Sequence, residues 1–501
     1  MKVLFLQNIW REYFGFMHLA SMLRQKHHVV DIRIFQNAQK AASAVDEFRP
    51  DVVGFSFTNC EQSWVLEVAG LIKQKHPNLP IIVGGPHPTL HPELVRKPQI
   101  DFLVRGEGEQ AILEFLDVLA GDGDFSEIKN LCFKRDGEVV MNPVRPLLED
   151  LDVLPFPDRE AYYKYKFLRN NPVKFFFTGR GCPYNCSFCF NRQFRDIYPN
   201  KKKYVRHYSA ERAIAEIIDV KAKYPMKFVR FEDDVFTMFP KWLEEFLDLY
   251  VKEINLPYLC YIRAGTGEDT IRLLKESGCY CALFGIETGD EKRRNELLNK
   301  GVKDEQIFET ASLLHKYKIH FFTTNMLALP GETFEDALKT IRINQKIKAP
   351  DVWCSIFQPY AGLPITEYAI KHGYLERVDD DTIGVNTFAD NVLNQPDIER
   401  IFNLHKFFYP LSRWPWLEPI ILPLTKLPAN PIFHYIFVFF YVISYWQHTH
   451  TPWRRIAAEG LHWFRVFLFD RVKKKKEKKN GLLRRIANLF RTKSRETGTI
   501  A

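Results

Sequence analysis

Short apolar runs alternate with helical patterns in the first part of this chain. The runs are V-L-F-L (3–6), V-D-I-R-I-F (30–35), D-V-V-G-F-S-F (51–57), P-I-I-V-G-G (80–85) and D-F-L-V-R-G (101–106). Between them lie amphipathic segments such as residues 61–75, whose apolar side chains recur at the spacing of one helix face. Repeated strand-helix units predict a Rossmann-like, doubly wound parallel sheet with helices on both faces.

A second alternating series begins after a Pro-rich passage at 148–158. Its apolar runs are K-F-F-F-T-G (174–179), K-F-V-R-F-E-D-D (227–234), Y-L-C-Y-I-R (258–263), Y-C-A-L-F-G-I-E (280–287), H-F-F-T-T-N-M-L-A-L (320–329) and D-V-W-C-S-I-F (351–357). Helical patterns separate them at 210–224, 241–253, 304–317 and 334–346. The series predicts a partial (β/α)6 TIM-like barrel, whose chemistry gathers at the carboxyl ends of the strands.

Beyond residue 379 the alternation stops and the chain becomes aromatic. We therefore predict an α/β fold with these parts: a first domain over 1–145, a linker over 146–173, the barrel over 174–378, a helical aromatic C-terminal region over 379–470, and a basic tail over 471–501. The apolar run at 431–446 is shorter than the ~20 residues that span a bilayer, which favours a buried or interfacial helix.

Charge is concentrated at the carboxyl end. The chain of 501 residues has a formal net charge of +9, yet residues 471–495 contain twelve Lys or Arg and one Glu. The rest of the chain is therefore slightly negative, which argues against nucleic acid as the partner of the body. Residues 481–491, G-L-L-R-R-I-A-N-L-F-R, have the pattern of a basic amphipathic helix.

The nine cysteines are scattered, and an odd count in a long chain favours reduced thiols. The opening M-K-V-L-F-L has too short an apolar run for a signal peptide and is interpreted as a buried strand. A cytoplasmic location is the expectation.

Three cysteines, Cys182, Cys186 and Cys189, form a CxxxCxxC pattern directly after the first strand of the second series. Iron-sulfur clusters usually take four thiolates, so a cluster held by three keeps one iron open for another ligand. A structural zinc site is the alternative, but it wants four ligands, and its other candidates, such as His207, are distant in the sequence.

This spacing, with Phe188 before the last cysteine, resembles the radical S-adenosylmethionine (SAM) superfamily. The resemblance implies a 4Fe-4S cluster on the three cysteines, SAM on the open iron, and a 5′-deoxyadenosyl radical that abstracts a hydrogen atom. The positions that match the family's SAM-contact regions are Phe188, Glu232, Asp233, Asp234, Arg263, Glu287 and Gly331. The acidic cluster is also compatible with a helix cap, and Pro330-Gly331 with a simple turn.

The first series resembles the cobalamin-binding domain of class B radical SAM enzymes, through V-G-F-S-F-T, I-I-V-G-G-P-H-P-T and I-D-F-L-V-R-G-E-G-E. The implied cobalamin contacts are Ser56, Thr58, Gly84, Gly85, His87, Thr89, Gly106 and Glu107. The family's DxHxxG pattern is missing, and His18 is expected to be a packed or surface residue. His87 and His91 are not expected to bind a metal, because no third ligand is spaced to join them.

The resemblance implies methylation of an unactivated carbon. The carboxyl end, which is both apolar and basic, points to an apolar, lipid-like substrate or another small molecule that the enzyme meets at the inner face of a membrane. A reduced electron-donor protein is the implied partner. One alternative is a radical SAM cyclase or another C–C or C–H transformation, since the architecture does not determine the outcome. Another is an RNA-modifying protein held by its basic tail. The C-terminal aromatic segment can also simply complete the core. No general acid or base is assigned.

Overall fold

The computed structural model describes residues 1–121, 123–378 and 393–449. Contacts group Met1–Tyr441 into one compact unit and Val442–Ala501 into a second. The predicted basic tail and the amphipathic pattern at 481–491 lie outside the described residues, as does part of the predicted region 379–470.

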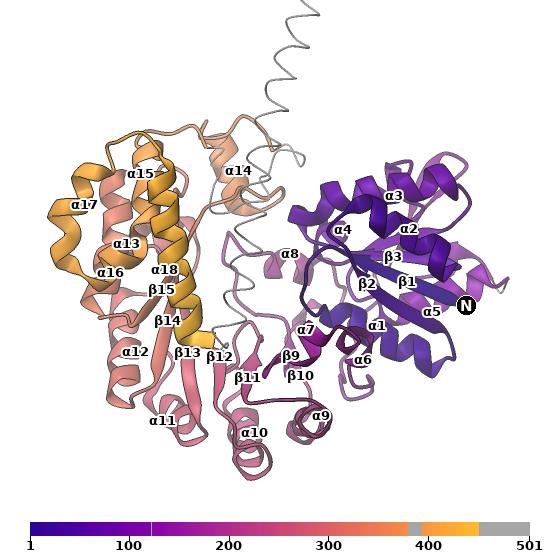
Figure 1. Cartoon of the computed structure of the whole chain (residues 1–501), viewed down its shortest axis with the longest axis horizontal. Coiled ribbons are helices and arrows are strands. Elements are labelled where there is room, and N and C mark those ends of the chain that lie inside the picture. The colour runs from indigo at the N-terminus through magenta and orange to yellow at the C-terminus, as the bar shows by residue number, and fades with distance from the viewer. Residues whose placement is uncertain (122, 379–392, 450–501) are drawn as a thin grey trace, which may run out of the picture. The chain divides into compact units, whose positions relative to one another are not determined.

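The first sheet has seven strands in the order β2-β1-β3-β4-β5-β6-β7 (Figure 1). They are β1 (Lys2–Gln7), β2 (Val29–Ile34), β3 (Val52–Ser56), β4 (Ile81–Gly84), β5 (Phe102–Val104), β6 (Leu131–Arg135) and β7 (Glu138–Met141). The first five are parallel, as predicted. The antiparallel hairpin of β6 and β7 extends the sheet beyond the prediction, which recognised no strand there.

Helices cover both faces of this sheet. They are α1 (Phe14–Gln25), α2 (Ala38–Phe48), α3 (Gln62–Lys75), α4 (Pro86–Leu90) and α5 (Glu109–Leu119). Residues of α1 and α5 share one buried cluster with the strands, and those of α2 and α3 share another. The doubly wound arrangement is thus confirmed, because each face of the sheet has its own apolar core.

The second sheet has six parallel strands in the order β15-β14-β13-β12-β11-β8, which confirms all six predicted runs. They are β8 (Val173–Phe176), β11 (Phe228–Phe231), β12 (Tyr258–Tyr261), β13 (Cys279–Glu287), β14 (His320–Leu327) and β15 (Asp351–Ile356). Its helices are α9 (Ala210–Lys223), α10 (Pro240–Glu253), α11 (Glu268–Glu276), α12 (Asp304–Lys316) and α13 (Phe334–Lys346). Strands adjacent in sequence are adjacent in the sheet, as in part of a barrel.

Two short strands and three short helices lie before and after the CxxxCxxC loop. They are α6 (Glu160–Tyr163), α7 (Lys166–Arg169), β9 (Gly179–Arg180), α8 (Asn191–Asp196) and β10 (Arg206–His207). In the linker, Arg159 donates to the carbonyl of Phe175 at 2.7 Å and pairs with Glu216 at 3.1 Å, with both charged side chains buried. Tyr162 hydroxyl donates to Gln7 of β1, so the linker packs against both sheets.

The last described helices are α14 (Pro364–Lys371), α15 (Ile398–Lys406), α16 (Phe408–Arg413), α17 (Glu418–Leu424) and α18 (Pro431–Thr449). The apolar run at 431–446 is thus helical, as predicted. Ile401, Leu404, Phe408 and Phe433 join the core that lies outside the second sheet. Among the described residues, none of the helices has the length and hydropathy needed to cross a membrane.

Candidate active site between the two sheets

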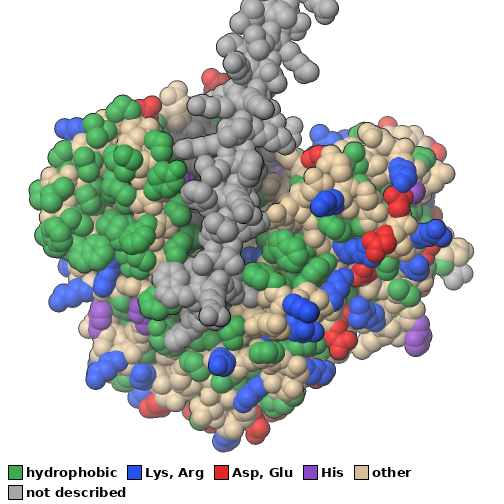
Figure 2. All heavy atoms as spheres, viewed as in Figure 1, with side chains coloured by type: hydrophobic (Ala, Val, Ile, Leu, Met, Phe, Trp, Pro, Cys, Tyr) green, Lys and Arg blue, Asp and Glu red, His purple; other side chains and the backbone are tan. Residues whose placement is uncertain are grey.

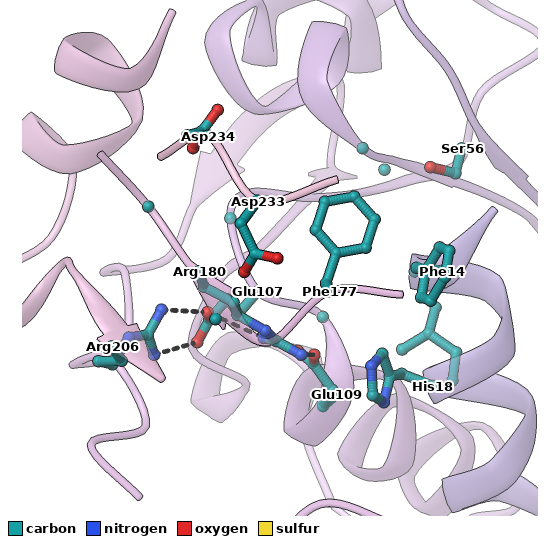
Figure 3. A pocket seen from close by; sticks show the side chains of 18 of the residues that line it. Phe14, His18, Ser56, Glu107, Glu109, Phe177, Arg180, Arg206, Asp233 and Asp234 are labelled. Carbon is teal, nitrogen blue, oxygen red and sulfur yellow. Dashed lines mark hydrogen bonds and ion pairs between the residues drawn. The ribbon is translucent and has the colours of Figure 1, made fainter. Parts of the chain in front are cut away.

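A cavity of about 430 Å³ opens at the carboxyl ends of strands from both sheets (Figure 3). The first domain contributes residues that end or follow β3, β4 and β5: Ser56, Gly84, Gly85, Gly106 and Glu107. The second contributes residues that follow β8 and β11: Phe177, Thr178, Asp233, Asp234 and Val235. Parallel strands end at one edge of a sheet, and two such edges bound this cavity.

Glycine allows the backbone of the first domain to approach the cavity closely. Gly85 has φ +90°, and a Cβ there would lie 2.4 Å from Ser56 Oγ and 2.9 Å from the nitrogen of Phe57. Gly106 has φ +74°, and its Cβ would lie within 2.3 Å of the Tyr198 hydroxyl. These positions require glycine, because a side chain is excluded both by conformation and by space. Together with Gly84 they form a glycine wall along the first domain's side of the cavity.

Three residues predicted to contact cobalamin do not line the cavity. Thr58 shares a capping box with Glu61, whose carboxylate accepts from the Thr58 amide at 2.8 Å. Thr89 accepts from the Gly106 amide at 2.9 Å and so holds the turn after β5. His87 is buried and stacks on His91 with 4.4 Å between ring centroids. Burial lowers the pKa of His87 to about 3, so this ring is neutral.

A charged cluster that the sequence did not reveal lies beside the cavity (Figure 3). Glu107 pairs with Arg180 at 2.9 Å and with Arg206 at 2.6 Å, and Arg180 also pairs with Glu109 at 2.7 Å. Burial by itself would raise the pKa of Glu109, but the charge and hydrogen bond of Arg180, a backbone hydrogen bond and the charge of Arg206 together hold that pKa below its usual value. The cluster joins the turn after β5 to the paired strands β9 and β10. In the sequence, the one signal that pointed to this charged cluster was the position of Arg180, two residues before Cys182.

The acidic residues after β11 have separate surroundings. Asp233 accepts from the Thr178 amide at 2.9 Å and from its hydroxyl at 3.0 Å, while burial raises its pKa to about 7. Asp234 is exposed in the cavity wall and adds to the negative field around Cys182. Glu232 pairs with Arg230 at 2.5 Å and does not line the cavity. The predicted acidic cluster is thus divided, and Asp233 and Asp234 face the space between the sheets.

The CxxxCxxC loop brings its three thiols close enough to influence one another. Burial is the main cause that raises the pKa of Cys182, to about 11, and Cys186 and Cys189 raise it further. The loop is held by the Cys189 amide, which donates to the Cys186 carbonyl at 3.1 Å, and by the Ser187 hydroxyl, which donates to the Leu297 carbonyl at 2.6 Å. Three neighbouring free thiols suit a cubane cluster, in which each thiolate binds a different iron.

A single-ion site, as in the zinc alternative, has a different requirement. Its ligands must converge on one point, at about 2.0–2.3 Å from the metal. In the part of the chain that the structure describes, no three His, Cys, Asp or Glu side chains are arranged to hold one ion.

The remaining predicted SAM contacts do not line the cavity. Arg263 and Gly331 follow β12 and β14, Glu287 is the last residue of β13, and Phe188 lies in the cysteine loop. Arg263 lies 3.6 Å from the ring centroid of Tyr184 in the cysteine loop, and its guanidinium donates to the Lys300 carbonyl. Phe188 packs in an apolar cluster with Leu298 and Leu329. Gly331, at φ +71°, donates to the side chain of Gln395 at 2.8 Å.

Glu287 has an unusual backbone. Its φ is +67°, and the strand pairing with β14 is irregular between Gly285 and Glu287. Its carboxylate pairs with Lys300 at 2.9 Å, and both side chains are largely buried. A non-glycine residue at positive φ is strained and commonly marks a functional site. The ammonium group of Lys300 also lies 5.7 Å from the ring centroid of Phe188 in the cysteine loop.

His18 is packed, as expected, but it also lines the cavity. Its Nε2 lies 3.4 Å from the Tyr208 hydroxyl, and its Nδ1 has no partner among the described residues. Burial, and next the charge of Arg180, lowers its pKa to about 3. A neutral imidazole with an unused nitrogen therefore faces the cavity, whereas the sequence indicated only a packed or surface residue.

Comparisons with known proteins agree with these two halves. The B12 binding domain family matches residues 12–116, and the radical SAM superfamily matches residues 176–343. The uncharacterized methyltransferase PH0819 of Pyrococcus horikoshii is 31% identical over 374 residues, which cover 72% of this chain and 79% of that protein. The chain belongs to the radical SAM superfamily and carries a B12-binding domain.

Other relatives of this radical SAM protein include enzymes with different reactions. The anaerobic magnesium-protoporphyrin IX monomethyl ester cyclase of Synechocystis is 26% identical over 325 residues, covering 61% of this chain and 63% of the cyclase. The solved structure of the methyltransferase TsrM from Kitasatospora setae, with cobalamin and a 4Fe-4S cluster bound, aligns with a TM-score of 0.60 at 17% identity and covers 75% of this chain and 76% of TsrM. The fold is therefore shared with TsrM.

The radical SAM match establishes a 4Fe-4S cluster and SAM as cofactors, and the B12-binding domain adds cobalamin. The residues present fit these cofactors, since three free thiols lie beside the second sheet and a glycine-lined wall lies at the carboxyl edge of the first sheet. The radical SAM enzyme also needs a reductant. The individual contacts of SAM and cobalamin stay predictions, which the next two experiments test.

We expect Cys186→Ala to abolish the cluster in this radical SAM enzyme, because two thiolates cannot hold a cubane. Iron per chain and the visible absorbance of the cluster, measured after anaerobic reconstitution, should fall at least about tenfold. Cys132→Ala removes a buried thiol of the first domain and is the matched control. Normal iron content in Cys186→Ala would contradict the assignment.

Glu107→Gln should weaken cobalamin retention, because it leaves Arg180 and Arg206 beside the cavity without their shared carboxylate. Removing one charged partner from a partly buried cluster is expected to lower the free energy of unfolding by about 2 kcal/mol. This is less than for a fully buried pair, because solvent screens the charges. Corrinoid per chain after gel filtration measures cobalamin retention. Urea unfolding of the apoprotein measures the change in stability. Glu127→Gln, on an exposed turn, should change neither. Unchanged corrinoid content in Glu107→Gln would rule out a role for the cluster in shaping the site.

Proposed function

We propose that this enzyme methylates an unactivated carbon of an apolar substrate. The observation that carries the proposal is the single cavity bounded by the glycine wall of the B12-binding domain and by Asp233 and Asp234 of the radical SAM domain. Cobalamin supplies a transferable methyl group, and the cluster with SAM supplies the radical that activates a C–H bond. Both chemistries would then be available to one substrate.

The residues of the chain have distinct parts in this proposal. The CxxxCxxC thiolates hold the cluster, and Glu287 and Arg263 are candidates to contact SAM beyond it. Gly84, Gly85 and Gly106 admit the cobalamin ring by their lack of side chains. Arg180, held by Glu107 and Glu109, orients the segment that leads into the cysteine loop.

An apolar substrate is supported by the aromatic side chains around the cavity. Phe14 of α1 and Phe177 after β8 are in edge contact with 4.7 Å between ring centroids. Phe239 and Trp242 contribute further aromatic surface from the second domain. Burial of apolar surface against such walls favours an apolar ligand.

The second candidate function is a radical-mediated ring formation without methyl transfer. It is favoured by the similarity to the Synechocystis cyclase, which the chain matches over both domains. The nucleic-acid alternative has less support, because the excess of positive over negative charge is confined to residues 471–495.

Isotope transfer distinguishes these functions. An apolar lipid extract is incubated with the reconstituted holoenzyme, a reduced flavodoxin or ferredoxin-type donor, and SAM that carries a trideuterated methyl group. Methyl transfer should give products heavier by the labelled methyl group, together with 5′-deoxyadenosine and S-adenosylhomocysteine in equal amounts. Formation of 5′-deoxyadenosine with an unlabelled product that has lost hydrogen would instead support the cyclase. Cys186→Ala should give neither product.

We propose further that the basic tail holds the enzyme at the inner face of a membrane. Anionic lipid attracts polybasic segments with about 1 kcal/mol per Lys or Arg near the surface. A chain ending at Asp470 should therefore bind vesicles rich in phosphatidylglycerol at least about tenfold more weakly than the full chain at low salt. Flotation with the vesicles measures the difference. Equal flotation of the two chains would exclude a role for the tail.

A further inference from the structure

An apolar surface lies on the outer side of the last described helices. Figure 2 shows hydrophobic side chains gathered over α17 and α18. The residues that form this outer aromatic face and their exposed fractions are Trp414 (39%), Trp416 (67%), Ile420 (58%), Leu427 (48%), Ile432 (67%) and Phe439 (61%). Single exposed apolar residues are ordinary, but six within one short region indicate an interaction surface.

Helix α18 is apolar on two sides. Phe433 is buried and stacks edge-on against Phe407 with 4.8 Å between ring centroids. Ile432 and Phe439, seven residues apart, lie on another side and are exposed. Packing in the core thus explains why the Phe433 side of α18 is apolar. Ile432 and Phe439, on the other side, do not contribute to that core.

The outer aromatic face is held rigidly. Phe440 stacks on Tyr409 at 5.4 Å and contacts Trp414 at 5.9 Å, which ties α18 to α16. The side chain of Asn403 donates to the carbonyls of Thr425 and Leu427, at 3.1 and 2.6 Å, and so fixes the turn between α17 and α18. A rigid apolar surface loses little conformational entropy on binding.

Charge indicates which partner this face suits. From Phe407 to Thr449 the sequence has one acidic residue, Glu418, and it pairs with Arg342 at 2.9 Å. Arg413 and Lys426 are exposed in the same region. The chain then continues into residues 471–495, which carry the excess positive charge. Trp residues beside basic residues are typical of the boundary between lipid headgroups and acyl chains.

We infer that the outer aromatic face docks on an anionic bilayer surface. This inference rests on the proposed function, because it explains how an apolar substrate reaches the enzyme. The face contributes apolar insertion and the tail contributes electrostatic attraction, the two signals that stable peripheral binding requires. A second copy of this chain is a poorer occupant, since each copy carries the same positive carboxyl end.

The test uses the full-length holoenzyme and vesicles of phosphatidylglycerol and phosphatidylcholine at about 0.5 M salt, where the attraction of the tail is screened. The double variant Trp416→Glu, Ile432→Glu places two charges on the face. Val153→Glu, Ile218→Glu is the matched control, because these residues are also exposed, at 64% and 41%, but lie in the linker and on α9. The face variant should bind vesicles at least about tenfold more weakly than the wild type, and the control should bind like the wild type.

Equal vesicle binding by the face variant and the wild type would overturn the inference. So would a wild-type dimer, detected by light scattering without vesicles, that the face variant abolishes, because the occupant would then be a second copy. Iron, corrinoid and 5′-deoxyadenosine formation are measured on the same samples. If methyl transfer fails while vesicle binding depends on the face, the proposed function fails and the docking surface stands.

Discussion

The carboxylate of Glu107 lies between the guanidinium groups of Arg180 and Arg206, and this cluster joins the two halves of the enzyme. Glu107 follows the last parallel strand of the B12-binding domain, whereas Arg180 precedes the cysteine loop of the radical SAM domain. The Glu107 amide also donates to the Tyr198 hydroxyl at 2.8 Å. The distance between the glycine wall and the cysteine loop therefore depends on a few charged contacts beside the cavity.

This arrangement makes chemical sense for an enzyme that uses two cofactors on one substrate. Each predicted cofactor site lies at the carboxyl edge of its own parallel sheet, where loops can vary without changing the fold. Facing the two edges toward one cavity brings both sites to the substrate without altering either fold. Aromatic residues such as Phe14 and Phe177 line this cavity together with charged residues such as Arg180 and Asp234.

Local patterns identified most of the strands and the long helices correctly, because hydrophobic periodicity is a property of adjacent residues. The helix predicted at 334–346 matches α13 (Phe334–Lys346), and the six predicted runs of the second series are its six strands. The hairpin of β6 and β7 was missed, since Leu131–Arg135 and Glu138–Met141 are short and the second is only partly buried. Among the site residues, Thr58 and Glu232 have local partners that only the folded chain reveals.

The sequence by itself determined the superfamily and predicted the cluster ligands, because Cys182, Cys186 and Cys189 are close in the chain and their spacing carries the chemistry. It also located the glycines after β4 and β5, whose need for positive φ is a local property. Tertiary structure decided the rest. The meeting of Glu107 with Arg180 and Arg206, the place of His18 in the cavity wall, and the exposure of Trp416 and Ile432 all depend on packing between segments that are distant in sequence, which no local pattern encodes.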